Sequence, residues 1–265
     1  MASTGRLSLL QRFVRWLEDW TLSLRLRLGS KILYDDVRKI VRISRSELVK
    51  GPCSRQELEA MEYVAAHTSV CLPRVHRTYD RPEGLFIAMD YIDGTCLDTV
   101  WSQLNDTDKR EIVMQVWHYA RQLHACRPPA SLNRPTAASV SGGPVRDGIL
   151  GVDDVGAVTV GPFATAGDFH HLTRGNPDVE AFPRSPPHTG LVHADLTPRN
   201  VIRTADGRLC IIDWEFAGWW PLYWERVKWY FSDFPTMPDW VTLLDEVSGW
   251  TTTVGEERGN LDEGE

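Results

Sequence analysis

The sequence predicts a protein of mixed α and β structure, and three observations carry this prediction. Apolar and polar residues alternate over short segments such as 37–43, as in a half-buried strand. Apolar residues recur with helical spacing over 106–125. Two short apolar runs flank a polar turn within 191–215, as in a strand hairpin. Periodicity alone leaves the arrangement of these elements open.

Composition limits the class of protein. The 265 residues suffice for one large domain or two lobes, with 42% apolar and 25% charged residues, as in ordinary soluble proteins. A net charge of −7 offers no basic field for a nucleic-acid backbone, so we expect no nucleic acid as partner. The cysteines are odd in number and lack CxxC spacing, which favours reduced thiols in a cytoplasmic protein over disulfides or a zinc site. They are Cys53, Cys71, Cys96, Cys126 and Cys210.

The N-terminal segment 7–28 has helical spacing, and Gly29 is placed to end the helix. Charges recur too often for a membrane span and the layout of a cleavable signal peptide is missing, so we expect no transmembrane segment. Two interpretations stay open. The helix either makes a weak membrane-surface or partner contact, or it packs on the neighbouring lobe. We favour packing.

The segment after the strand expected at 37–43 contains a candidate ion pair. A second strand begins at 47–50, and a helix is expected over 54–66 with Glu57 at the capping-box position. Glu57 also shares the apolar face of that helix. The residues of this face are Leu58, Met61, Val64 and Ala65. Because a carboxylate on an apolar face needs a cation, we interpret Lys50 as its partner, with Glu59 as the fallback carboxylate.

The stretch 191–215 holds the strongest chemical signal. Asp195 and Asn200 lie five residues apart in a loop, and a hairpin with a tight turn at 206–207 brings Asp213 beside them. Two carboxylates and an amide oxygen are hard oxygen ligands, suited to Mg²⁺ held together with substrate phosphates. One carboxylate can hold the metal while the other takes a proton from an attacking hydroxyl. This division is typical of a kinase-type phosphoryl transferase.

His193 precedes this set and raises a second interpretation. The spacing HxD also begins the iron site of two histidines and one carboxylate, but that site needs a further histidine downstream. His193 is the last histidine of the chain, which excludes the iron site. We expect His193 to brace the loop backbone.

The motif pair HADLTPRN (193–200) and IIDWE (211–215) resembles that of the aminoglycoside phosphotransferase and choline kinase superfamily, in its fungal phosphotransferase branch. Protein kinases carry HRD and DFG instead, so the resemblance, which covers 37–250, points to a small-molecule kinase. It implies an α+β, bilobal protein-kinase-like fold with a small antiparallel-sheet N-lobe and a mostly helical C-lobe. The expected parts are an amphipathic helix (1–29), the N-lobe (30–92), the C-lobe (93–251) with a loop-rich insert (127–190), and a disordered acidic tail (252–265).

The resemblance also implies the reaction, an ATP-dependent transfer of the γ-phosphate to a hydroxyl of a small molecule. Asp195 would orient or deprotonate that hydroxyl, and Asn200 and Asp213 would hold Mg²⁺.

The nucleotide contacts are implied in the same way. Lys50, fixed by Glu57, would engage the upstream phosphates. The backbone of the linker from Asp90 to Ile92 would hydrogen-bond the adenine edge.

Some features depart from the family pattern. Segment 30–36, where the family's phosphate-covering loop is expected, contains no glycine. A catalytically silent kinase-like module, binding nucleotide or acting as a scaffold, is therefore the alternative function. A metal-dependent phosphohydrolase is a third, weaker hypothesis because it gives Lys50 and Glu57 no task.

The second half of the chain has unusual composition. Nine of the sixteen prolines lie in 127–190, which indicates a loop-rich insert that shapes a substrate pocket. Seven of the eleven tryptophans lie between 214 and 250. They form either an aromatic box for a cationic or planar substrate or the core of a helical lobe, and we favour the core.

Overall fold

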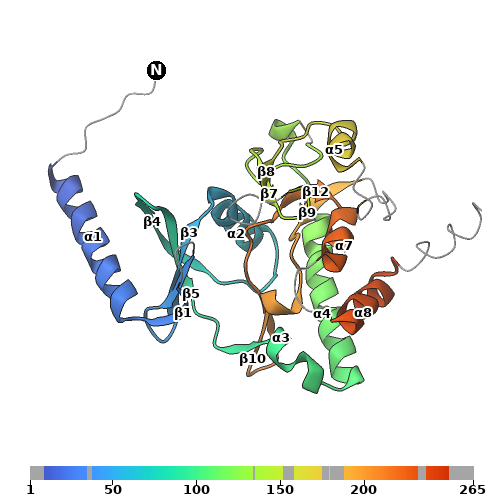
Figure 1. The fold of residues 1–265 in the computed structure, drawn as a ribbon, viewed down its shortest axis with the longest axis horizontal. Coiled ribbons are helices and arrows are strands. Elements are labelled where there is room, and N and C mark those ends of the chain that lie inside the picture. Colours follow the sequence, from blue (N-terminus) through green and yellow to red (C-terminus); the bar gives the residue numbers. More distant parts are fainter. Residues whose placement is uncertain are drawn as a thin grey trace, which may run out of the picture. The chain divides into compact units, whose positions relative to one another are not determined.

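A computed structural model describes residues 9–34, 38–133, 135–151, 158–174, 179, 188–231 and 237–250. The chain divides into two compact units, and Figure 1 shows their elements. The first unit comprises Met1–Ser54 and Arg74–Tyr91, and the second comprises Arg55–Pro73 and Ile92–Glu265. The expected acidic tail lies outside the described residues.

The first unit is built on an antiparallel sheet that has five strands among the described residues, in the order β1-β2-β3-β5-β4. The strands are β1 (Ser30–Tyr34), β2 (Lys39–Arg42), β3 (Glu47–Cys53), β4 (Val75–Arg81) and β5 (Gly84–Asp90). The strands predicted at 37–43 and from 47–50 are β2 and β3. Lys50 lies on the central strand β3, opposite Ile40 of β2 and Ile87 of β5.

Helix α1 (Leu9–Leu28) packs on this sheet, as we favoured from the sequence. Leu22 and Leu26 are buried in the core of the first unit. Their partners in that core are Val41, Val49, Phe86 and Ala88. The N–H of Gly29 donates to the carbonyl of Arg25 at 2.8 Å, where the helix ends. None of the described helices is long and apolar enough to span a bilayer.

Strand β1 corrects one expectation. We expected a loop at 30–36, whereas Ser30–Tyr34 forms a strand paired with β2. Its register shifts between Lys31 and Leu33, so a bulge breaks the period of two by which strands are recognised. The connection from β1 to β2 is therefore 35–38, a segment that also contains no glycine.

Helix α2 (Arg55–His67) begins the second unit. Gln56 ties it to later parts of that unit, since its Nε2 donates to the Ala217 carbonyl at 3.0 Å and its Oε1 accepts from the Arg146 N–H at 3.0 Å. Glu57 and three of the four predicted apolar positions are buried. Ala65, the fourth of these positions, is exposed.

The second unit contains the remaining helices and strands that the structure describes. They are β6 (Gly94–Cys96), α3 (Leu97–Val100), η1 (Trp101–Gln103), α4 (Asp106–Ala125), η2 (Ala130–Leu132), β7 (Val145–Asp147), β8 (Val158–Val160), α5 (Ala166–Thr173), β9 (Thr189–Val192), η3 (Pro198–Asn200), β10 (Val201–Thr204), β11 (Leu209–Ile211), β12 (Gly218–Pro221), α7 (Tyr223–Tyr230) and α8 (Pro238–Ser248). Helix α4 matches the prediction and contacts β9 and α8. Strand β10 pairs with both β6 and β11, and β9 pairs with β12.

The tryptophans near the C-terminus form a core, which confirms the favoured interpretation over an aromatic box. Trp214, Trp219, Trp220, Trp224, Trp229 and Trp240 are all buried. Trp220 and Trp224 stack with ring centroids 5.6 Å apart, and Phe169 of the insert meets Trp224 edge-on at 5.1 Å. The aromatic run therefore anchors the insert to α7.

A buried carboxylate also holds the insert. Asp147, at the end of β7, is fully buried and accepts hydrogen bonds from the N–H groups of Ile149 at 2.7 Å and Leu150 at 3.0 Å. Trp224 Nε1 donates to its Oδ2 at 3.0 Å, and Lys228 Nζ lies 3.3 Å from the same oxygen. Such a buried charge is tolerated because it is both paired and hydrogen-bonded.

A disulfide overturns the expectation that all five cysteines are reduced. Cys71 and Cys210 are bonded across 139 residues of sequence. A backbone hydrogen bond lies beside the disulfide, since the N–H of Ile211, the residue after Cys210, donates to the Cys71 carbonyl at 2.8 Å. The expectation failed because the pairing is created by folding and leaves no short motif. Cys53, Cys96 and Cys126 are free thiols.

Candidate active site

The loop between β9 and β10 carries Asp195 and Asn200, and both are buried. The turn η3, which begins at Pro198, folds Asn200 back onto the aspartate. Asn200 Nδ2 donates to the Asp195 carbonyl at 2.9 Å and to its Oδ2 at 2.7 Å. Because Asn200 lies five residues after Asp195 and the turn brings it back, its amide can hold the Asp195 carboxylate.

Ile212 connects this loop to the segment that carries Asp213. Its N–H donates to the Asn200 carbonyl at 2.9 Å, and its carbonyl lies 3.2 Å from His193 Nε2. His193 Nδ1 accepts from the Asp195 N–H at 3.2 Å, so Nε2 carries the proton that goes to Ile212. His193 braces the backbone, as expected, and the residue after Ile212 is Asp213.

Glu225 of α7 fixes the start of the loop. It is fully buried, and its two oxygens accept the N–H groups of His193 at 2.9 Å and Ala194 at 3.1 Å. Ala194 has φ 61° and Asp213 has φ 62°, in the left-handed region that non-glycine residues seldom occupy. Backbone strain of this kind clusters at functional sites and persists only where neighbours hold it. Glu225 supplies that restraint at Ala194.

Arg199 occupies a position that the sequence analysis did not single out. Its Nη2 donates to both carboxylate oxygens of Asp195 at 3.0 Å. A positive charge four residues after the aspartate, within the same loop, was the available signal. The guanidinium competes for the same carboxylate that would receive a proton from an acceptor.

Cys96 of β6 supports the loop from another side. Its thiol donates to the Arg199 carbonyl at 2.9 Å. Burial, together with the hydrogen bond and negative charge of Asp98, raises the pKa of Cys96 to about 12. The thiol therefore stays protonated near neutral pH, where it serves as a hydrogen-bond donor and not as a nucleophile.

The donor set fits Mg²⁺. The amide nitrogen of Asn200 is occupied by Asp195, which leaves its Oδ1 as the atom suited to a hard cation. The carboxylate of Asp213 follows directly on the Ile212 junction. Among the described residues no group of three or more histidine, cysteine, aspartate or glutamate side chains forms a metal cluster.

The other predicted residues are distributed between the two units. Lys50 and Asp90 belong to the first unit, and Glu57 and Ile92 to the second, so the ion pair between Lys50 and Glu57 stays a prediction. The Asp90 carboxylate accepts the Arg74 N–H at 3.1 Å and lies 2.7 Å from His76 Nε2. Its own N–H donates to the Arg74 carbonyl, so these contacts hold the end of β5 in place.

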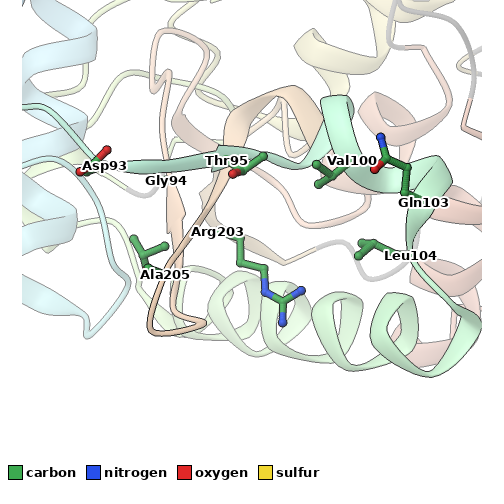
Figure 2. Close-up of a pocket in the computed structure, with 9 residues that line it drawn as sticks. Asp93, Gly94, Thr95, Val100, Gln103, Leu104, Arg203 and Ala205 are labelled. Atoms are coloured by element: carbon green, nitrogen blue, oxygen red, sulfur yellow. The ribbon is translucent and has the colours of Figure 1, made fainter.

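A shallow cavity of about 610 Å³ lies elsewhere in the second unit. Figure 2 shows the side chains of Thr95, Gln103 and Arg203 around it. Its lining residues are Asp93, Gly94, Thr95, Val100, Gln103, Leu104, Arg203, Thr204 and Ala205. Asp195, Asn200 and Asp213 do not line this cavity, so it is distinct from the candidate catalytic loop.

Comparison with known families decides the classification. The model of the phosphotransferase enzyme family matches residues 30–247, which is most of the chain and includes both motifs. The chain belongs to this family. No curated protein matches it.

Solved structures of the phosphotransferase fold agree. The chain is similar to APH(2")-IIa in its ternary complex with streptomycin and ATP, with a TM-score of 0.58 at 12% identity, over 93% of this chain and 83% of that one. It is similar to the GDP and kanamycin complex of APH(2")-IIia, with a TM-score of 0.57 at 13% identity, over 90% and 82%. It is also similar to APH(3'')-Id from Streptomyces rimosus, with a TM-score of 0.51 at 17% identity, over 91% of this chain and 94% of that one. The expected α+β protein-kinase-like fold is confirmed, with an antiparallel sheet first and helices after it.

Proposed function

We propose that this family member is an ATP-dependent phosphotransferase that moves the γ-phosphate to a hydroxyl of a small molecule. The observation that carries the proposal is the junction at Ile212, which joins the loop of Asp195 and Asn200 to Asp213. Membership of the phosphotransferase family supports the reaction class. Neighbouring structures that contain ATP or GDP support a nucleotide as donor.

Each residue near the junction has a task in this reaction. Asp195 would orient the acceptor hydroxyl and take its proton. Asn200 and Asp213 would hold Mg²⁺, which when bound neutralises charge on the phosphates. Asn200 would also keep the Asp195 carboxylate in place through the hydrogen bond from its Nδ2.

The nucleotide contacts complete the proposal. Lys50, supported by Glu57, would engage the upstream phosphates, and the backbone between Asp90 and Ile92 would contact the adenine. A cytoplasmic location is part of the proposal, because the reaction consumes ATP.

A silent nucleotide-binding or scaffold module is the second candidate function. Two observations favour it. Arg199 holds both oxygens of the carboxylate that would act as base. The connection 35–38 between β1 and β2 has no glycine to let a backbone approach phosphates closely.

Thermal melting with ATP or GTP, each with Mg²⁺ or with chelator, tests nucleotide binding. A nucleotide at a hundred times its dissociation constant stabilises by about 2.7 kcal/mol. This corresponds to a rise in Tm of roughly 5–10 °C for a protein of this size. The rise should need Mg²⁺, and Asp213→Ala should remove it. If neither nucleotide raises Tm, ATP-dependent transfer is contradicted.

Turnover separates the two candidate functions. Wild-type protein is incubated with Mg-ATP and a panel of sugars, amino sugars and amino alcohols, and phosphorylated products are detected by mass spectrometry. Asp195→Asn should lower the rate by roughly 10²–10⁴ and leave the nucleotide-dependent rise in Tm intact. A nucleotide-dependent rise in Tm without any product favours the silent module.

A further inference from the structure

Helix α1 has two apolar stripes on opposite sides. Leu22 and Leu26 point into the core of the first unit. A second stripe, which we call the outer stripe, is formed by Leu17, Trp20, Leu24 and Leu28, with exposed fractions of 42%, 54%, 42% and 78%. The spacing of three, four and four residues aligns these side chains along one face. At 100° per residue, that face lies nearly half a turn from the buried one.

The packing of α1 fixes which face points outward. Besides the two buried leucines, Ser23 Oγ accepts a hydrogen bond from Arg81 Nη2 of β4 at 3.1 Å. The Arg81 guanidinium also lies over the ring of Phe86, at 5.6 Å from its centroid. Rotating the helix to bury the outer stripe would remove Leu22 and Leu26 from the core and break the hydrogen bond to Ser23. The exposure of the stripe is therefore a consequence of the native packing.

Exposed apolar side chains concentrate here. The described residues include nine exposed large hydrophobic side chains, and four of them make up the outer stripe. Two more, Ile32 and Leu33, lie in β1, directly after the helix. Scattered apolar residues on a surface are ordinary, whereas a contiguous row marks an interaction site.

The charges beside the outer stripe indicate the kind of partner. Arg25 and Arg27 are exposed, and their helical positions lie on either side of the stripe, in the last turn of α1. An apolar row with a tryptophan, bordered by arginines, is the pattern of helices that lie in a lipid interface. We propose that α1 docks the protein on an anionic lipid surface, with the outer stripe in the headgroup region and the two arginines against the lipid charges. The chain as a whole has a net charge of −7, so both the stripe and the arginines are needed.

Co-sedimentation with vesicles tests the proposal on the full chain. The probes are vesicles of phosphatidylcholine alone and with about 30% phosphatidylserine, in low salt and in about 0.5 M NaCl. We expect the protein to pellet with the anionic vesicles in low salt, and pelleting to fall when salt is added or the anionic lipid is omitted. Failure to pellet with either vesicle overturns the proposal.

Three variants locate the contact. Trp20→Ser combined with Leu24→Ser should lower the partition coefficient at least tenfold, because it removes the centre of the stripe. Arg25→Gln combined with Arg27→Gln should lower it by about fivefold per arginine. The matched control is Met114→Ser on α4, which removes a side chain of similar exposure (55%) outside the stripe and should pellet like wild type.

The remaining outcomes are also decisive. Tm values within about 2 °C of wild type show that the serine variant is folded. If that folded variant pellets like wild type, the outer stripe is not the lipid contact and the proposal is wrong. The wild type could instead fail to pellet with either vesicle and form a concentration-dependent dimer that the serine variant does not form. In that case the proposal is wrong, and the outer stripe joins two copies of the chain.

Discussion

Replacing Glu225 by glutamine should destabilise the protein strongly, although the change is nearly isosteric. The carboxylate is fully buried and accepts two backbone N–H groups, from His193 and Ala194. A glutamine has one acceptor oxygen, and its NH₂ group would face the second N–H. One hydrogen bond is lost, one buried donor is left unsatisfied, and the remaining bond loses its charge assistance.

The magnitude follows from those contacts. Hydrogen bonds to a charged group contribute about 1.5–3 kcal/mol each, and an unsatisfied buried donor costs about 1–3 kcal/mol. The neutral glutamine avoids the desolvation cost of a buried charge, and this offsets part of the loss in stability. We therefore expect Glu225→Gln to lower the free energy of unfolding by roughly 2–4 kcal/mol. The corresponding fall in Tm is roughly 5–15 °C.

The assay is urea unfolding together with thermal melting. The matched control is Glu246→Gln, whose carboxylate pairs with Arg110 at 2.8 Å on the surface. That exposed pair should contribute less than about 1 kcal/mol. If Glu225→Gln loses no more stability than Glu246→Gln, Glu225 does not hold the loop as described. Glu225→Asp keeps the charge but shortens the side chain, and an equally large loss would show that reach matters as well as charge.

Three further predictions concern other parts of the second unit. Arg199→Ala should raise the rate of Mg-ATP hydrolysis by water several-fold, measured as phosphate release, because it frees the Asp195 carboxylate. Cys210→Ser should lower the free energy of unfolding by roughly 2–5 kcal/mol in urea, since it opens a long closed loop. Burial opposes ionisation of Asp239, but hydrogen bonds led by that from Lys109 outweigh it and hold its pKa below the usual value. The ionised Asp239 carboxylate therefore stabilises the folded protein above its unfolded-state pKa of about 3.9. This stabilisation is lost as the pH falls through the lower pKa of the folded state. The stability difference between wild type and Asp239→Asn should shrink on acidification from pH of about 6 to about 3.5.

Each of these predictions has a control and a contradicting outcome. Arg208→Ala removes an exposed arginine and should leave hydrolysis unchanged. A large drop in hydrolysis with Arg199→Ala would mean that Arg199 positions the base instead of blocking it. Cys126→Ser removes a free thiol and should cost little, and the disulfide's contribution is refuted if both cysteine variants unfold alike. A pH-independent effect of Asp239→Asn would contradict the direction of its pKa shift.

The central part of the site could be predicted from sequence because its geometry is local. Asp195 and Asn200 lie within one loop, and Asp213 follows a hairpin whose turn contains Gly207 with φ 83°. A spacing of a few residues determines which groups can meet. The strand β2 and the helix α4 were predictable for the same reason, since the apolar residues of each recur with a regular period.

Contacts made by distant residues could not be predicted in this way. Glu225 reaches the loop from a helix more than thirty residues further along the chain, and no pattern in the sequence announces its target. Cys71 and Cys210 meet only after folding. Strand β1 was missed because its bulge breaks the alternation. Arg199 is an intermediate case. The sequence shows that it lies four residues from Asp195, but it does not show that the Arg199 side chain points toward the Asp195 carboxylate.

The buried Asp147 has a consequence for how this protein can change over evolutionary time. This fully buried carboxylate accepts the N–H groups of Ile149 and Leu150, which directly follow β7, and contacts the Trp224 and Lys228 side chains of α7. The insert is also held by Phe169, which packs on Trp224, and by the Arg146 N–H, which donates to Gln56 of α2. Substitutions in the remaining loops can then accumulate without moving the ends of the insert, because loops tolerate change better than the elements that hold them. Asp147 would thus keep the end of β7 fixed to α7 while the sequence of the surrounding loops changes.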